Sequence, residues 1–218
     1  MKRTVLSRFS WAPIGTRMFI AARWFLTPYT RIASYLPKQG TLLDLGCGYG
    51  LFAMAAREQF PGLRVIGIDH DPARVRVASR VADSDPRLEF AVGDLLKPPE
   101  GIFEAIALLD LMHYFEPAQQ ERIFVRAYEQ LRLGGTLLVR EVDPRGDLSA
   151  LFNRAWEKLM TATGLTRTAR QGLHFRSSAG WREALERIGF RVETVPCSFF
   201  LFSDVLFVAE KKSVDTVE

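Results

Sequence analysis

Cysteine and histidine are scarce in this chain of 218 residues, which contains two cysteines and three histidines. Cys47 and Cys197 lie far apart in the sequence, so they indicate neither a disulfide framework nor the clustered ligands of a zinc site. None of the histidines is paired at helical spacing. We therefore predict a protein without a bound metal, in a reducing compartment such as the cytoplasm.

Acidic residues are absent before Asp44, and no apolar run is long enough to cross a membrane. The most apolar stretch, 17–26, is interrupted by Arg23 and falls short of the roughly 20 residues that a transmembrane helix needs. A signal peptide is not expected for the same reason. The formal net charge of +4 comes largely from this amino-terminal region. The other arginines are scattered, as on an ordinary solvated surface, so nucleic acid is not an expected partner.

The rest of the composition is that of a globular protein, with 48% hydrophobic and 25% charged residues. A chain of this length can bury about 70% of its unfolded surface in a single core. The sequence shows neither an internal repeat nor a low-complexity segment. These features predict one compact domain.

Three glycines at alternating positions stand out in the segment 41–50, TLLDLGCGYG. An apolar strand leads into Gly46, Gly48 and Gly50, and a helical pattern follows at once. Glycine is needed where a backbone turns tightly or approaches a ligand closely, because a Cβ atom there would clash. A strand, a glycine turn and a helix N-terminus together form the mouth of a nucleotide-type site in a doubly wound sheet.

A second apolar strand, 63–68, ends at Asp69. A carboxylate at that point of such a fold can accept hydrogen bonds from both hydroxyls of a bound ribose. The alternative is a turn that leads into the next helix, for which Asp71 is the expected N-cap and Pro72 the first residue.

Two further strands end at polar residues. Strand 88–92 is followed by Asp94, and strand 103–109 is followed by Asp110. Because open α/β sheets bind ligands at the carboxyl ends of their strands, we expect these groups to gather around one cleft.

Five ordered motifs resemble those of class I S-adenosylmethionine-dependent methyltransferases: LDLGCGYG, VIGIDHD, AVGDLL, IALLDLMHYF and LRLGGTLLVRE. The resemblance covers residues 42–141, and segment 205–211 is similar to the last, antiparallel strand of that family. It implies an α/β fold with a doubly wound, seven-stranded, mostly parallel sheet of Rossmann-like type and extra amino-terminal helices. The expected organisation is a helical extension or lid over 1–40, a methyltransferase domain over 41–212 and a flexible tail over 213–218.

The resemblance also implies S-adenosylmethionine as the cofactor, with a role for each matching residue. Asp44 would lie near the methionine amino group, Asp69 would hold the ribose hydroxyls, and Asp94 would meet the adenine amine. His70 and Leu95 would lie against the adenine ring. The complete set implied to contact the cofactor is Asp44, Gly46, Cys47, Gly48, Gly50, Asp69, His70, Asp94, Leu95, Asp110 and Leu111.

Methyl transfer from a sulfonium requires mainly the alignment of donor and acceptor, and it needs a general base only where the acceptor still carries its proton. His113, just beyond the fourth strand, is the first candidate for that base, although it could instead bind a backbone carbonyl. Tyr114 could orient the substrate or be a half-buried aromatic residue. Glu141, at the end of the fifth strand, is a third candidate, and it could instead pair with Arg140 or hold a loop.

Helical periodicity predicts helices around 117–131, 148–159 and 178–188. The polar segment 161–176 lies between the last two. It is expected to cover the acceptor site, with His174 reaching inward, or to form a surface loop.

The amino-terminal helix around 17–26 is apolar over most of its circumference and allows two interpretations. It could pack over the cleft as a lid. It could instead lie in a membrane surface and bury Phe19, Trp24 and Phe25, which would make the protein peripheral at the inner membrane. The basic residues that would then face anionic head groups are Lys2, Arg3, Arg8, Arg17, Arg23 and Arg31.

Three functions follow from these patterns. The first is methyl transfer to a small, apolar or lipid-like metabolite. The second is an NAD(P)-dependent oxidoreductase, although the third glycine comes one residue earlier than in the dinucleotide fingerprint and no Ser-Tyr-Lys set is visible. The third is a non-catalytic module that binds S-adenosylmethionine at a membrane-associated complex. Methylation of base amines is not expected, because the motif after the fourth strand lacks an Asn-Pro-Pro-Tyr type sequence.

Overall fold

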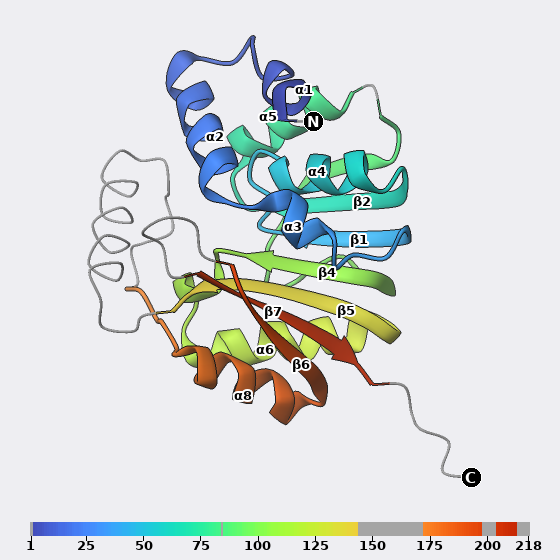
Figure 1. Cartoon of the computed structure of the whole chain (residues 1–218), viewed down its shortest axis with the longest axis vertical. Coiled ribbons are helices and arrows are strands. Elements are labelled where there is room, and N and C mark those ends of the chain that lie inside the picture. The colour runs from blue at the N-terminus through green and yellow to red at the C-terminus, as the bar shows by residue number, and fades with distance from the viewer. Residues whose placement is uncertain (1, 84, 144–171, 198–203, 213–218) are drawn as a thin grey trace.

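The computed structural model describes residues 2–83, 85–143, 172–197 and 204–212. Seven strands form one sheet in the order β3-β2-β1-β4-β5-β7-β6 (Figure 1). Strand β7 is antiparallel to both of its neighbours, and the other neighbouring pairs run parallel. The predicted fold is confirmed: a mostly parallel, doubly wound sheet of the Rossmann-like type. The strands are β1 (Gln39–Leu45), β2 (Gly62–Asp69), β3 (Leu88–Val92), β4 (Phe103–Leu109), β5 (Leu131–Val142), β6 (Phe190–Pro196) and β7 (Asp204–Lys211).

Helices connect the strands and precede the first of them. The described helices are α1 (Lys2–Ser7), α2 (Ile14–Leu26), α3 (Tyr29–Ala33), α4 (Leu51–Gln59), α5 (Pro72–Ala82), the 3-10 turn η1 (Met112–Tyr114), α6 (Pro117–Gln130) and α8 (Ser178–Ile188). The helix expected around 148–159, most of the segment 161–176 and the tail 213–218 lie outside the described residues. None of the described helices combines the length and the hydropathy needed to span a bilayer.

Capping residues fix the helix boundaries much as the sequence predicts. The Asp71 side chain accepts a hydrogen bond from the Ala73 backbone N–H at the start of α5, and Ser177 caps α8 in the same way. Helix α8 ends at Gly189, whose φ of +118° suits glycine. One boundary was predicted wrongly: α6 ends at Gln130, and Leu131 begins β5 rather than completing the helical face. Leu131 is apolar and continues the spacing of the buried residues of α6, although it belongs to the next strand. Hydrophobic periodicity alone therefore could not separate the end of the helix from the start of the strand.

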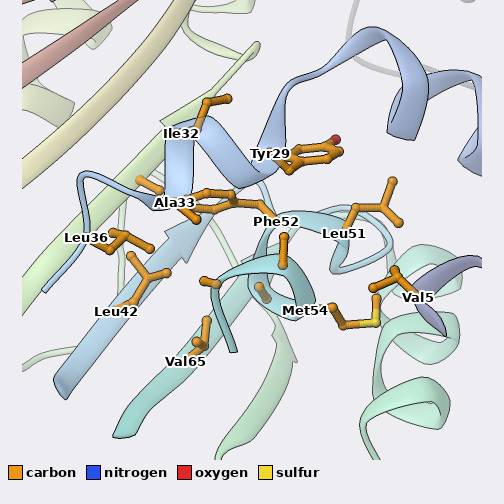
Figure 2. Close-up of a cluster of buried hydrophobic side chains, with 14 of the residues drawn as sticks. Val5, Tyr29, Ile32, Ala33, Leu36, Leu42, Leu51, Phe52, Met54 and Val65 are labelled. Atoms are coloured by element: carbon orange, nitrogen blue, oxygen red, sulfur yellow. The ribbon is translucent and has the colours of Figure 1, made fainter. Parts of the chain in front are cut away.

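Two hydrophobic clusters cover the two faces of the sheet, because successive strand side chains point to opposite sides. Leu42 belongs to one cluster and Leu43 to the other. The first cluster joins β1 and β2 to α1, α3 and α4, as Figure 2 shows for Val5, Ile32 and Phe52. The second cluster lies beneath α6 and α8. The layered core therefore holds the strand ends rigidly where a ligand site can form.

The amino-terminal helices share the first of these clusters with the sheet. Val5 of α1, Ile20 and Trp24 of α2, and Ile32 of α3 are all 4% exposed or less. The first helices consequently have a fixed position against α4 and the strands, and this position brings α2 to the carboxyl ends of the strands.

Candidate active site

The glycine turn after β1 is held against the neighbouring strand by its own backbone. The N–H groups of Gly46 and Cys47 both donate to the carbonyl oxygen of Ile68, at 2.7 and 3.1 Å. Gly46, Gly48 and Gly50 have φ values of +78°, +54° and +75°, where L side chains are strained. A Cβ atom on Gly46 would come within 2.6 Å of Leu111 Cδ2. The turn can therefore lie flat against the end of β4 only with glycine in this position.

A cavity of about 320 Å³ opens at the carboxyl ends of β1, β2 and β4. Its size is within the range of small-molecule sites, and it lies at the topological switch point where the strand order reverses. The sequence-predicted residues that line it are Asp44, Gly46, Cys47, Gly48, Asp69, His70, Asp94, Leu95, Asp110, Leu111 and Tyr114. Gly50 is not part of this lining; it is the N-cap of α4, where a Cβ atom would meet the ring of Phe90.

Asp44 is the most unusual charged group of the cavity. Its side chain is buried, and its Oδ2 atom meets no hydrogen-bond partner among the described residues. Burial, with a smaller contribution from the neighbouring Asp69 carboxylate, raises the pKa of Asp44 to about 7. An unpaired buried carboxylate is costly. A bound ammonium group would remove that cost, which fits the methionine end of S-adenosylmethionine.

Asp69 sits beside Asp44 and is bound on both oxygens by backbone groups. Its Oδ2 accepts from the Gly48 N–H and its Oδ1 from the Asp71 N–H, each at 2.9 Å. His70 Nδ1 lies 3.4 Å from Oδ1. These bonds join the glycine turn to the end of β2, and a carboxylate retains further acceptor capacity for ribose hydroxyls. Both sequence interpretations of Asp69, as turn former and as ribose ligand, are compatible with this geometry.

Asp110 directly follows β4 and forms ion pairs with two arginines. Arg23 of α2 donates from Nη2 to Asp110 Oδ2 at 2.7 Å, and Arg140 of β5 donates to Oδ1. Arg140 also donates to Asp204 of β7. Burial alone would raise the pKa of Asp110, but Arg140 and Arg23 together hold it below its ordinary value. Asp110 therefore stays ionised, in the left-handed conformation at φ +58°.

His113 and Glu141 form a buried pair behind this wall. His113 Nδ1 lies 2.7 Å from Glu141 Oε2, and the other Glu141 oxygen accepts from the backbone N–H groups of Leu111 and Met112. Glu141 thus holds the loop, which was one of its predicted alternatives, and it pairs with His113 rather than with Arg140. Within the described part of the chain, the cavity lining includes neither residue, whereas Tyr114 lines it and packs on His113 with ring centroids 4.2 Å apart.

Gln120 ties the residues around His113 to the later chain. It is fully buried, and its Nε2 donates to the carbonyl oxygens of Met112, Phe115 and His174, each at 3.0 Å. The His174 N–H donates to the His113 carbonyl oxygen, and the Phe175 ring stacks on the His113 ring. The part of 161–176 that the structure describes therefore packs against η1, and His174 is not part of the cavity lining.

The amino-terminal helices contribute side chains to the cavity lining for which we predicted no such position from the sequence. Phe19, Arg23 and Tyr29 line the cavity, and the Phe19 ring packs edge-on against Tyr49 of the glycine turn at 5.7 Å. One signal was available. An arginine within an otherwise apolar helix needs a buried partner, and Arg23 finds it in Asp110.

A family model described as a methyltransferase domain matches residues 19–195 of this chain. The chain belongs to this family. S-adenosylmethionine is the cofactor of the family, and the unpaired Asp44, the glycine turn and Asp69 fit it. Sequence relatives of this chain include bovine acetylserotonin O-methyltransferase, which is 30% identical over 73% of the chain and 48% of the relative. A 2-methyl-6-phytyl-1,4-hydroquinone methyltransferase from Synechocystis is 31% identical over 71% of the chain and 47% of the relative. Carboxy-S-adenosyl-L-methionine synthase from Helicobacter pylori is 29% identical over 70% of the chain and 60% of the relative.

Solved structures show the same fold. An O-methyltransferase family 2 protein from Planctomyces limnophilus, in complex with apigenin, superposes with a TM-score of 0.70 at 24% identity, over 89% of this chain and 59% of the other. Human N-acetylserotonin methyltransferase, in complex with S-adenosylmethionine, superposes with a TM-score of 0.67 at 20% identity, over 90% and 55%. The chain therefore spans about half to three fifths of the length of these relatives.

Replacing Asp44 with Asn should stabilise the ligand-free protein while weakening its affinity for S-adenosylmethionine. The folded-state pKa of Asp44 lies above the unfolded value, so its contribution to stability is present at low pH and is lost as the pH rises through about 7. Asn avoids that loss. Thermal unfolding between about pH 5 and pH 8 should show Asp44→Asn gaining over the wild type as the pH rises, by about 1 to 3 kcal/mol.

Isothermal titration at about pH 8 should show at least about tenfold weaker binding of S-adenosylmethionine to Asp44→Asn. The matched control is Asp94→Asn, because Asp94 lines the same cavity but is exposed. That control should leave the free energy of unfolding within about 1 kcal/mol of the wild type, because Asp94 is exposed. An Asp44→Asn protein that is no more stable than the wild type, or that binds the cofactor equally well, would contradict this assignment.

Proposed function

We propose that this protein transfers the methyl group of S-adenosylmethionine to a small, apolar, aromatic acceptor. The observation that carries the proposal is the composition of the cavity lining. It combines Asp44, a buried carboxylate without a described partner, with several aromatic side chains. The first feature suits the cationic amino acid end of the cofactor, and the second suits a planar acceptor.

The cofactor supplies a methyl group that is already activated by a positive sulfur. The protein's contribution is consequently to bind, to orient and to exclude water. Asp44 would hold the ammonium group, Asp69 the ribose hydroxyls and Asp94 the adenine amine. Asp110, kept ionised by its arginines, would place negative charge near the sulfonium.

Aromatic side chains supply much of the remaining lining. The apolar and aromatic residues in question are Phe19, Tyr29, Phe52, Leu109, Tyr114 and Phe115. Ring systems bind well between such side chains because they offer large apolar area with defined geometry. Two of the relatives carry the names of aromatic substrates, acetylserotonin and a hydroquinone, which supports an aromatic acceptor here.

The amino-terminal helices would act as a lid over this cavity. Helix α2 bridges it with two contacts: Phe19 packs on Tyr49 of the glycine turn, and Arg23 binds Asp110 at the end of β4. A lid of this kind excludes water from the reacting groups.

His113 would be the general base for an acceptor that carries its proton, once the Tyr114 ring turns aside, because Tyr114 separates His113 from the cavity. Glu141 contacts Nδ1 and orients the ring, so proton transfer would take place at Nε2. Tyr114, which faces the cavity in front of His113, would contact the acceptor.

Methyl transfer is tested by incubating the protein with labelled S-adenosylmethionine and a panel of phenols, hydroquinones and indoles, together with a cell extract. We expect label in the organic-solvent phase, because an apolar aromatic product partitions there. Asp69→Ala is the control that should lose the signal through weaker cofactor binding. Label confined to the aqueous phase or to precipitated macromolecules would contradict the acceptor class. Binding of the cofactor without any transfer would favour a non-catalytic module.

His113→Gln is expected to lower the rate of methyl transfer by about 100-fold or more while leaving cofactor affinity within about twofold. Glutamine can keep a hydrogen bond to Glu141 but cannot take up a proton from the acceptor. Tyr114→Phe is the comparison, and it should change the acceptor KM while keeping most of the rate. Full turnover of His113→Gln across about pH 6 to 8 would exclude His113 as the base.

Arg23→Met is expected to release α2 from the cavity. Because one partner of a largely buried ion pair is removed, backbone hydrogen exchange of residues 14–26 should accelerate by about tenfold or more, and cofactor dissociation should become faster. Arg17→Met, on the exposed side of the same helix, is the matched control. If both variants exchange and dissociate like the wild type, the lid assignment is wrong.

A further inference from the structure

Helix α2 has a second apolar face, which points away from the cavity. Ile14 is 68% exposed and Met18 is 67% exposed. Their spacing of four residues places them on one side of the helix, whereas Phe19 and Arg23 on the other side line the cavity. We refer to Ile14 and Met18 as the outer stripe.

The outer stripe differs from ordinary exposed apolar residues, which are scattered singly over a protein surface. Its members lie on one helix, and that helix also forms part of the wall of the ligand cavity. A helix that is apolar on opposite sides is satisfied only when both sides are covered. The core and the cavity cover the inner side.

The charge around the outer stripe indicates what covers the outer side. Arg8, Arg17 and Arg31 are exposed near it in the chain, and no acidic residue occurs before Asp44. Either an acidic protein partner or an anionic lipid surface would complement this positive charge. The exposed apolar side chains that lie between the arginines in the chain also need an apolar environment directly beneath the negative charge. A bilayer with anionic head groups has that arrangement.

We propose that the outer stripe docks this protein on an anionic membrane surface. Ile14 and Met18 insert at the boundary between head groups and acyl chains, and Arg8 and Arg17 contact the phosphate groups. The helix that lies on the bilayer then also borders the cavity, so the acceptor is an aromatic compound dissolved in the membrane. This last step rests on the proposed methyltransferase function, whereas the docking itself does not.

Docking is tested by co-sedimentation of the full chain with vesicles of phosphatidylcholine, alone or with about one third phosphatidylglycerol. We expect binding to the anionic vesicles that weakens as salt is added, and little binding to the neutral vesicles. Exchanging both Ile14→Ser and Met18→Ser should lower the partition coefficient by about tenfold or more.

The matched control carries Ile102→Ser and Leu133→Ser. These side chains are 66% and 57% exposed, but they lie at the amino ends of β4 and β5, away from the cavity. This control should sediment like the wild type. A second pair, Arg8→Gln with Arg17→Gln, should lose binding to the anionic vesicles, whereas the remote pair Arg122→Gln with Arg132→Gln should retain most of it.

Two results would overturn the docking proposal: a wild type that does not sediment with anionic vesicles, or an Ile14→Ser, Met18→Ser variant that sediments equally well. Light scattering tests the alternative that a second copy of this chain covers the stripe. If the wild type is a dimer that does not bind vesicles, and the Ile14→Ser, Met18→Ser variant is a monomer, the stripe is a subunit contact instead. Cofactor affinity, measured in solution for each variant, should stay unchanged. Failure of docking is thereby separated from failure of methyl transfer.

Discussion

The ion-pair network centred on Asp110 determines how the site is assembled. Asp110 binds Arg23 from α2 and Arg140 from β5, and Arg140 continues to Asp204 of β7. The two arginines and two aspartates of this largely buried network balance in formal charge. Removing one member would leave an uncompensated charge, which is far more costly than losing an exposed pair. The amino-terminal helix, the end of β4 and the antiparallel strand are therefore fixed relative to one another around the cavity.

Asp44 shows the opposite arrangement, because its charge has no described partner and its pKa is raised to about 7 by burial. A buried carboxylate with a raised pKa in a cavity is typical of a functional site, which supports the role in cofactor binding that we propose for Asp44. The two aspartates thus differ in their surroundings. Asp110 is paired with arginines of the protein itself, whereas Asp44 lies in the cavity wall without a described partner.

Much of the cavity lining could be predicted from the sequence because its residues follow local rules. Gly46 and Gly48 stand where the backbone must turn with positive φ, and Asp69 and Asp94 stand at the ends of buried strands. The strand order brings these short motifs to one edge of the sheet. Gly50 fell outside the cavity lining because its positive φ serves the start of α4 and its packing on Phe90, a requirement that looks the same in sequence.

Periodicity, glycine spacing and the acidic residues after each strand were enough to determine the α/β fold and the edge of the sheet at which the cavity opens, since each depends on residues close together in the chain. The tertiary structure alone decided which side chains complete the cavity. Arg23 meets Asp110 across 87 residues, and His113 meets Glu141 across 28. It also decided that His113 lies behind Tyr114 and that α2 presents one apolar face to the cavity and another to solvent. Contacts between distant segments depend on how the layers pack, and no local pattern records that packing.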